Sequence, residues 1–386
     1  MPKNIFIATG LLHGHFTGDV EIIRELISLG HNVTCMVLDE FENRIKDIGA
    51  KLIVINFDRA NCKLPPDAPP YAINCYIFPT AIDKILTFLS TEKNNYDYFI
   101  FDSFFDIKEM NKVLNIPIDK LILICSSFIF IGNNSYLDIA PLRSFQLKPI
   151  NIKYNINLHD FVTIHYIPNK FKKLILTSKY FHFRGEDTDD TCFFIGPNIE
   201  KRKKDENFKF IKDKNKTLIY ISLGTIINEQ IDFYLKCIEA FKNKEEYQVI
   251  LSVGKFLDIK KLGEIPKNFS IFSYVPQTQL LPDVDIFITH GGINSIQEGL
   301  FAGILLIVIP QANDEFDNGK KVEELGAGIS LDKNKINIEA LQNAVKNIEV
   351  NKEKYKLGIR KIIESFKDSI NKRKNIFEKM FKWIFS

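Results

Sequence analysis

The feature that most constrains the fold is the regular alternation of short apolar runs with segments of helical periodicity along the whole chain. Apolar runs of about four to eight residues are typical of strands buried on both faces, as in parallel sheets. The segments between them supply the crossover helices that parallel strands require. The pattern therefore predicts an α/β fold in which helices cover both faces of parallel sheets.

The first half of the chain carries one such set of elements, ending near residue 197. The expected strands are 4–9, 32–37, 51–55, 98–102 and 121–125. The expected helices are 19–29, 80–92 and 106–114. Gly30 follows the first of these helices, where glycine is the preferred terminating residue.

A second set follows a polar stretch, 197–217, whose composition predicts an interdomain linker. Its expected strands are 218–222, 248–253, 285–289 and 304–309, and its expected helices are 230–242 and 294–301. Because 386 residues exceed the usual size of one core, we expect two domains. We set them at 1–203 and 204–365, with 366–386 a helix that packs back on the first domain. Two such domains leave a cleft lined by the carboxyl ends of both sheets.

Composition narrows the class of protein. The net charge of +3 comes from scattered lysines, which argues against a nucleic-acid partner. The six cysteines form no CxxC pair, so neither a zinc site nor a disulfide framework is indicated, and a cytoplasmic location is expected. The longest apolar run, 121–131, is too short to span a bilayer, so no stable membrane insertion is expected. The amphipathic segment 377–385 is expected to dock on the protein itself, in a monomer or weak dimer.

A diphosphate site is predicted where the strand ending at Thr289 turns through His290, Gly291 and Gly292 into a helix that opens near Asn294. Unpaired backbone N–H groups and the positive end of that helix would face the cleft. The glycines allow close approach of the backbone, and His290 can donate to the leaving phosphate. In isolation the same string would be a tight turn with a helix cap, but its strand-to-helix context favours phosphate binding.

The segments 274–277, 285–298 and 303–310, followed by Asp314 and Glu315, resemble the donor-binding signature of UDP-glycosyltransferases. Further matches at 194–197, 221–225 and 252–255 extend the resemblance to most of the chain, which is similar to the macrolide glycosyltransferase branch. The resemblance implies a glycosyltransferase-B fold, with two Rossmann-like domains facing across a cleft. The first would bind the acceptor and the second the nucleotide sugar.

The resemblance also implies the residues of the donor site. Glu298 would accept both ribose hydroxyls, while Val275 and Gln277 would lie beside the base. The expected donor-binding residues are Gly224, Thr225, Val275, Gln277, His290, Gly291, Gly292, Asn294, Ser295, Glu298, Asp314 and Glu315.

Catalysis is assigned to His15 and Asp102. The segment 10–18 surrounds His15 with glycines after a central strand, which predicts an exposed histidine on a flexible loop. In the family the Gly-His position holds the general base, and imidazole chemistry suits that role. Asp102 ends the strand 98–102 at the same sheet edge and would orient and stabilise the imidazole. His13 is the weaker candidate for the base.

The expected reaction is an inverting single displacement without metal or other cofactor, in which a hexose moves from UDP-glucose or a related UDP-sugar to a hydroxyl group. The aspartates at 283 and 285 resemble a metal-binding pair but are better explained as a turn and a strand start, and 187–190 as a solvated loop. The acceptor is expected to be a small hydrophobic or aromatic molecule of the macrolide, polyketide or flavonoid kind. Residues roughly 60–80 and 130–170 would line its pocket.

Three departures from the family pattern qualify these expectations. Thr17 and Gly18 replace the usual Asn-Pro, which is expected to loosen the start of the helix. Glu315 replaces the usual Gln, and a carboxylate cannot donate as an amide does, so both the sugar and the choice of UDP over dTDP stay open. The Asn that the family usually has a few residues later is expected to be replaced by Lys320.

Three other functions fit parts of the pattern. A UDP-sugar epimerase would share the architecture but would not need the His15 loop with Asp102. A nicotinamide oxidoreductase would require GxGxxG after the first strand, which is missing. A non-catalytic nucleotide-sugar-binding protein would use the same donor residues, so the sequence alone leaves it open.

Overall fold

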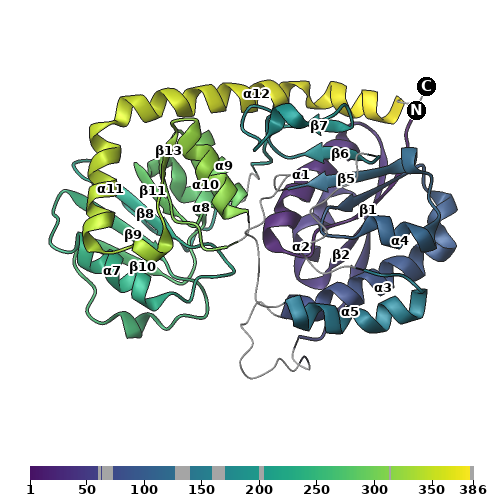
Figure 1. The fold of residues 1–386 in the computed structure, drawn as a ribbon, viewed down its shortest axis with the longest axis horizontal. Coiled ribbons are helices and arrows are strands. Elements are labelled where there is room, and N and C mark those ends of the chain that lie inside the picture. Colours follow the sequence, from purple (N-terminus) through teal and green to yellow (C-terminus); the bar gives the residue numbers. More distant parts are fainter. Residues whose placement is uncertain are drawn as a thin grey trace.

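The computed structural model describes residues 1–59, 62, 73–126, 140–158, 170–199, 204–312 and 314–382. It contains two α/β domains side by side, and a long helix runs along one edge of both (Figure 1). All strand pairs of the two sheets are parallel. The predicted fold class is therefore confirmed.

The first domain is built on a seven-stranded sheet with the order β3-β2-β1-β4-β5-β6-β7. Its strands are β1 (Asn4–Ala8), β2 (Asn32–Leu38), β3 (Lys51–Ile55), β4 (Tyr98–Asp102), β5 (Leu121–Cys125), β6 (Lys172–Ile175) and β7 (Cys192–Phe194). Its helices are α1 (His13–Ser28), α2 (Glu42–Ile45), α3 (Asn74–Glu92), α4 (Ile107–Leu114) and α5 (Ala140–Tyr154). The central strand β1 lies between β2 and β4, so a residue that follows it sits at the middle of the sheet edge.

The second domain is built on a six-stranded sheet with the order β10-β9-β8-β11-β12-β13. Its strands are β8 (Thr217–Ser222), β9 (Tyr247–Ser252), β10 (Phe269–Phe272), β11 (Ile286–Thr289), β12 (Leu305–Val308) and β13 (Gly328–Ser330). The helices of this half are α7 (Ile231–Phe241), α8 (Gln277–Leu280), α9 (Ile293–Phe301), α10 (Glu315–Glu324), α11 (Ile338–Val350) and α12 (Lys352–Lys382). The strand β11, which leads into the predicted phosphate loop, lies in the interior of this sheet.

Each domain has its own hydrophobic core, as the chain length predicts. In β1 all four residues from Ile5 to Ala8 are buried, and in β11 all four from Ile286 to Thr289 are buried. Continuous burial follows from helices that cover both faces of a parallel sheet. The two sheets are therefore rigid supports for the loops at their carboxyl ends.

The helix α1 begins at His13 rather than at Asp19. The hydroxyl of Thr17 donates to the carbonyl oxygen of His13 at 2.8 Å, and Gly18 packs so closely against Leu176 that a Cβ there would collide with it. Tertiary packing thus overrides the weak helix propensity of glycine. The expectation that Thr17 and Gly18 loosen the helix start is wrong.

The strands β6, β7, β10 and β13 were not predicted from the sequence. In β6 two consecutive lysines, Lys172 and Lys173, are buried. Because lysine is usually exposed, they make the strand look like a polar segment in the sequence. The ammonium group of Lys172 donates to the carbonyl oxygens of Asp119 and Met380, and that of Lys173 donates to Thr191. Hydrogen-bonded burial of this kind requires partners from distant segments, which local sequence does not reveal.

The helix α12 runs across both domains (Figure 1). Phe366 belongs to the second core, whereas Phe377 and Met380 belong to the first. Between them Arg373 donates to the carbonyl oxygens of residues 195–197 and pairs with Glu25 at 3.4 Å. The helix therefore ties the domains together. Within the described ranges no helix has the length and apolar character needed to cross a membrane.

Candidate active site

His15 and Asp102 meet at the carboxyl edge of the first sheet. His15 lies in the first turn of α1, directly after β1, and Asp102 ends the neighbouring strand β4. The imidazole Nδ1 lies 3.0 and 3.1 Å from the two carboxylate oxygens of Asp102. Asp102 is fully buried and also accepts the backbone N–H of Phe104 at 2.8 Å. The structure thus brings together the two residues that the sequence assigns to catalysis.

The contacts of His15 define which nitrogen is available. Because a carboxylate only accepts hydrogen bonds, Nδ1 carries the proton and Nε2 is the basic nitrogen. Nε2 makes no hydrogen bond with a described residue, whereas Nδ1 also lies 2.6 Å from the hydroxyl oxygen of Ser126. The edge of the ring packs on Phe104, with centroids 3.9 Å apart. His15 is therefore held rigidly with its basic nitrogen unoccupied.

The surroundings of His15 correct one expectation and add one residue. The side chain is only 14% exposed and belongs to a helix, so the predicted exposed histidine on a flexible loop is wrong. Ser126 was not predicted, although it follows β5, the strand next to β4. Polar residues that end neighbouring parallel strands meet at one edge, and this rule could have found it.

The loop between β11 and α9 has the geometry of an anion site. Gly291 has φ of +95°, which glycine adopts without strain, and a Cβ there would lie 2.6 Å from Val308. No side chain caps the amino end of α9. The first N–H groups of this helix therefore remain available to an anion, together with the positive end of the helix dipole.

His290 is packed between two glycines, Gly224 and Gly292. A Cβ on Gly224 would lie 2.5 Å from Cε1 of the ring, and one on Gly292 would lie 2.5 Å from Nε2. Burial lowers the pKa of His290 to about 4. At neutral pH the ring is uncharged, so it can serve as a neutral hydrogen-bond donor.

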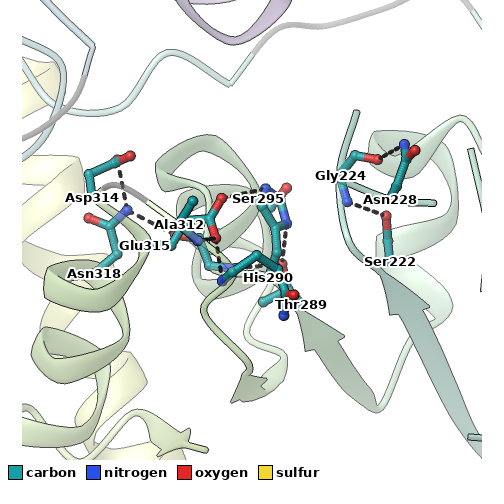
Figure 2. Close-up of polar contacts among 12 residues, drawn as sticks. Ser222, Gly224, Asn228, Thr289, His290, Ser295, Ala312, Asp314, Glu315 and Asn318 are labelled. Atoms are coloured by element: carbon teal, nitrogen blue, oxygen red, sulfur yellow. Dashed lines mark hydrogen bonds and ion pairs between the residues drawn. The ribbon is translucent and has the colours of Figure 1, made fainter. Parts of the chain in front are cut away.

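The start of α10 lies beside this loop (Figure 2). Glu315 accepts the N–H groups of Gln311 and Ala312 through one oxygen, at 2.6 and 2.9 Å. Its other oxygen lies 4.0 Å from Nε2 of His290. Burial raises the pKa of Glu315 to about 8, and burial also raises the pKa of Asp314. Around neutral pH Glu315 is mostly protonated, so it can donate a hydrogen bond that a carboxylate could not.

Asn318 is a site residue that the sequence analysis missed. Its amide donates to the carbonyl oxygen of Gly291 at 2.8 Å and to Asp314 at 3.0 Å, while its Oδ1 is buried without a partner in the described part of the chain (Figure 2). Lys320 instead pairs with Glu324 at the surface. The expected replacement of an Asn by Lys320 is therefore wrong, because Asn318 faces the site one turn after Asp314.

Gln277, Ser295 and Glu298 form a hydrogen-bonded group on the other side of α9. The amide of Gln277 donates to Glu298 at 2.7 Å and to the hydroxyl of Ser295 at 3.3 Å. The side chain of Val275 packs in the second core, whereas its neighbour Tyr274 is half exposed. The side chain of Tyr274 therefore offers an exposed aromatic surface next to this group.

The loop after β8 is held by Asn228, a third residue that was not predicted. The side-chain amide of Asn228 donates to the carbonyl oxygen of Gly224 at 2.8 Å (Figure 2). It also fills the space beside Gly254, where a Cβ would lie 2.5 Å from it. Asn228 thus fixes Gly224 against His290, while Thr225 at the tip of the loop is exposed.

The two halves of the site face each other. The side-chain amide of Asn294, in the first turn of α9, donates to the carbonyl oxygen of Gly14 at 2.7 Å. Gly14 directly precedes His15, and His15 acts electrostatically on Asp314 of the second domain. The anion site and the histidine base therefore lie close together where the two domains meet.

The aspartates considered for a metal have other partners. Asp285 accepts the N–H of Leu218 and pairs with Lys212, both at 2.8 Å. Asp187 pairs with Arg184. Across the described segments no three His, Cys, Asp or Glu side chains are grouped so as to hold a metal ion.

A cavity of about 590 Å³ lies in the first domain between the end of β3, α3 and α5. It is lined by Phe57, Tyr76 and Pro79 together with Asp58 and Asp83. None of its lining residues belongs to the catalytic or donor sets. Much of the range predicted to line the acceptor pocket, 60–61, 63–72, 130–139 and 159–169, lies outside the described residues.

The chain is similar to known proteins over most of its length. The family described as "UDP-glucoronosyl and UDP-glucosyl transferase" matches residues 193–373. The NDP-glycosyltransferase YjiC of Bacillus subtilis is 30% identical over 88% of both chains. The oleandomycin glycosyltransferase of Streptomyces antibioticus is 25% identical over 86% of this chain and 79% of its own. The crystal structure of the glycotransferase of kitacinnamycin superposes with a TM-score of 0.77 at 22% identity, covering 98% of this chain and 99% of the other.

Proposed function

The chain belongs to the UDP-glycosyltransferase family, and we propose that it is an inverting, metal-independent enzyme that moves a hexose from a UDP-sugar to a hydroxyl group of a small hydrophobic acceptor. His15 is the general base and Asp102 its partner. The observation that carries this proposal is the basic nitrogen of His15, which makes no hydrogen bond with a described residue and lies near the anion site of the second domain.

The chemistry is a single displacement. Nε2 of His15 takes the proton of the acceptor hydroxyl while that oxygen bonds to the anomeric carbon, and the bond from that carbon to the phosphate oxygen breaks. Asp102 stabilises the imidazolium that forms. The charge on the departing UDP is met by the N–H groups at the start of α9 and by His290, which donates as a neutral ring.

UDP-glucose is the first donor to test, because the group formed by Gln277, Ser295 and Glu298 is suited to a ribose and Asp314 and Glu315 to sugar hydroxyls. The acceptor class is supported by the relative named for oleandomycin. Macrolide, polyketide and flavonoid hydroxyls are the acceptors to screen.

The test is a panel of UDP- and dTDP-sugars against mixed hydroxylated acceptors, with products identified by mass spectrometry and anomeric configuration by NMR. With an active pair, H15A should retain UDP binding by calorimetry but lose transfer. H13A is the matched control, since His13 lies two residues away, is exposed and packs on Phe41. Unchanged transfer by H15A would refute the base, and retention of the anomeric configuration would refute the single displacement.

A further inference from the structure

A second buried carboxyl group, that of Asp19, lies behind the catalytic pair and has no role in the reaction described above. Asp19 follows His15 by one turn of α1 and is fully buried. One of its oxygens accepts the N–H of Gly10 at 2.6 Å. The other has no hydrogen-bond partner in the described part of the chain.

Gly10 connects Asp19 to the catalytic pair. A Cβ on Gly10 would collide with Cβ of His15 and would lie 3.1 Å from the Oδ2 atom of Asp102. The backbone of Gly10 is therefore packed against both catalytic side chains. By holding the N–H of Gly10, Asp19 fixes the turn from β1 to α1 that carries the base.

The charges around Asp19 determine its protonation state. It faces Asp102 of β4 and the thiol of Cys35 in β2, and His15 of its own helix faces Asp102 and, across the cleft, Asp314. Among described cations none forms an ion pair with Asp19. Asp102 receives two donors, His15 and Phe104, whereas Asp19 receives one. Burial and the nearby charge of Asp102 both raise the pKa of Asp19.

We propose that Asp19 is a protonated, neutral positioning residue of the base, which holds the β1–α1 turn through Gly10 and leaves Asp102 to carry the negative charge beside His15. This inference rests on the proposed role of His15. A second carboxylate at this place would increase the proton affinity of the imidazole.

The first test measures stability and needs no substrate. A carboxyl group that is protonated when folded and ionised when unfolded contributes stability below its unfolded pKa of about 3.9, and this stability is lost as the pH rises. D19N keeps an oxygen for the N–H of Gly10 but cannot ionise. The Tm of D19N minus that of the natural protein should therefore grow by at least about 3 °C between about pH 5 and pH 8.

D97N is the matched control, because Asp97 also accepts one backbone N–H, that of Asn4, but does so at the exposed amino end of the same sheet. Its Tm difference should not grow with pH. If the Tm difference for D19N is flat or shrinks as the pH rises, Asp19 is ionised in the folded protein and the proposal is overturned.

The second test measures catalysis. D19N should keep kcat within about twofold and leave the acid limb of the kcat/KM profile in place. D19A, which releases Gly10, should lower kcat on the order of tenfold without changing UDP affinity. A shift of the acid limb by D19N, or full kcat in D19A, would overturn the positioning role.

The thermal and catalytic tests distinguish a failure of the Asp19 proposal from a failure of the His15 assignment. The thermal comparison of D19N decides the protonation state even if D19A does not fold or no acceptor is found. If H15A retains transfer, the base assignment fails while the thermal result for Asp19 still stands.

Discussion

The base side and the donor side of the site hold their functional groups in different ways. The base side is made of polar side chains held by hydrogen bonds, namely His15, Asp102, Ser126 and Asp19. The donor side is made of backbone N–H groups and of space that glycines leave around the neutral ring of His290. The base side therefore depends on the charges of its side chains, and the donor side on the space around the His290 ring.

This difference separates the expected effects of substitution. A change on the base side should alter kcat and its pH dependence while UDP still binds, because the residues proposed to hold the nucleotide belong to the second domain. A change on the donor side should weaken UDP binding or stability, because an added atom collides with a ring that has no room to move. A base-side variant that loses UDP binding, or a donor-side variant that changes only kcat, would show that the two sides are not independent.

The largest effect is expected for D102N. An amide keeps the shape but can stabilise neither the Nδ1–H tautomer nor the imidazolium, so kcat should fall by about 10² to 10⁴. Steady-state kinetics with calorimetry of UDP binding would measure this. A fall in UDP affinity of the same size would contradict the separation of the two sides.

Next is G224A, compared with G303A. Both glycines have positive φ, +76° and +77°, but only at Gly224 would a Cβ collide with His290. Both variants place an alanine at positive φ and so carry the same backbone strain. Only G224A adds the overlap of the new Cβ with His290, which costs about 1 to 3 kcal/mol. UDP affinity should fall roughly tenfold or more in G224A relative to G303A, and equal affinities would show that His290 moves freely.

E315Q tests the protonated carboxyl group on the donor side. The pKa of Glu315 is raised from its usual value of 4.5 to about 8, so its contribution to stability is present below about pH 4.5 and is lost as the pH rises to about 8. Gln keeps an oxygen for the two backbone N–H groups. The stability of E315Q relative to the natural protein should rise across this window by up to about 1.4 kcal/mol per pH unit, measured by urea unfolding. A constant difference would place an ionised carboxylate there.

The smallest effect is expected for S126A. The hydroxyl shares Nδ1 of His15 with Asp102, and one such hydrogen bond is worth about 0.5 to 1.5 kcal/mol. We expect kcat to fall about two- to tenfold with UDP affinity unchanged. A loss as large as that of D102N would make Ser126 an equal partner of the base.

Much of the framework follows from the sequence alone. The alternation of apolar runs and helices predicts both sheets, and β3, β4 and β5 have the predicted bounds. Because parallel strands place their carboxyl ends at one edge, the sequence also predicts that His15 and Asp102 lie together and that the loop after Thr289 faces a cleft. These conclusions depend on periodicity and chain direction, which are local properties.

The tertiary structure decided what depends on distant neighbours. Packing on Leu176 extends α1 to His13, bonds to the distant carbonyl oxygens of Asp119 and Met380 bury Lys172, and the partners of Asn318 place it rather than Lys320 in the site. The protonation of Asp19 and Glu315 likewise arises from burial and neighbouring charge. Burial and electrostatic interactions between residues far apart in the chain exist only once the chain has folded, so no local pattern encodes them.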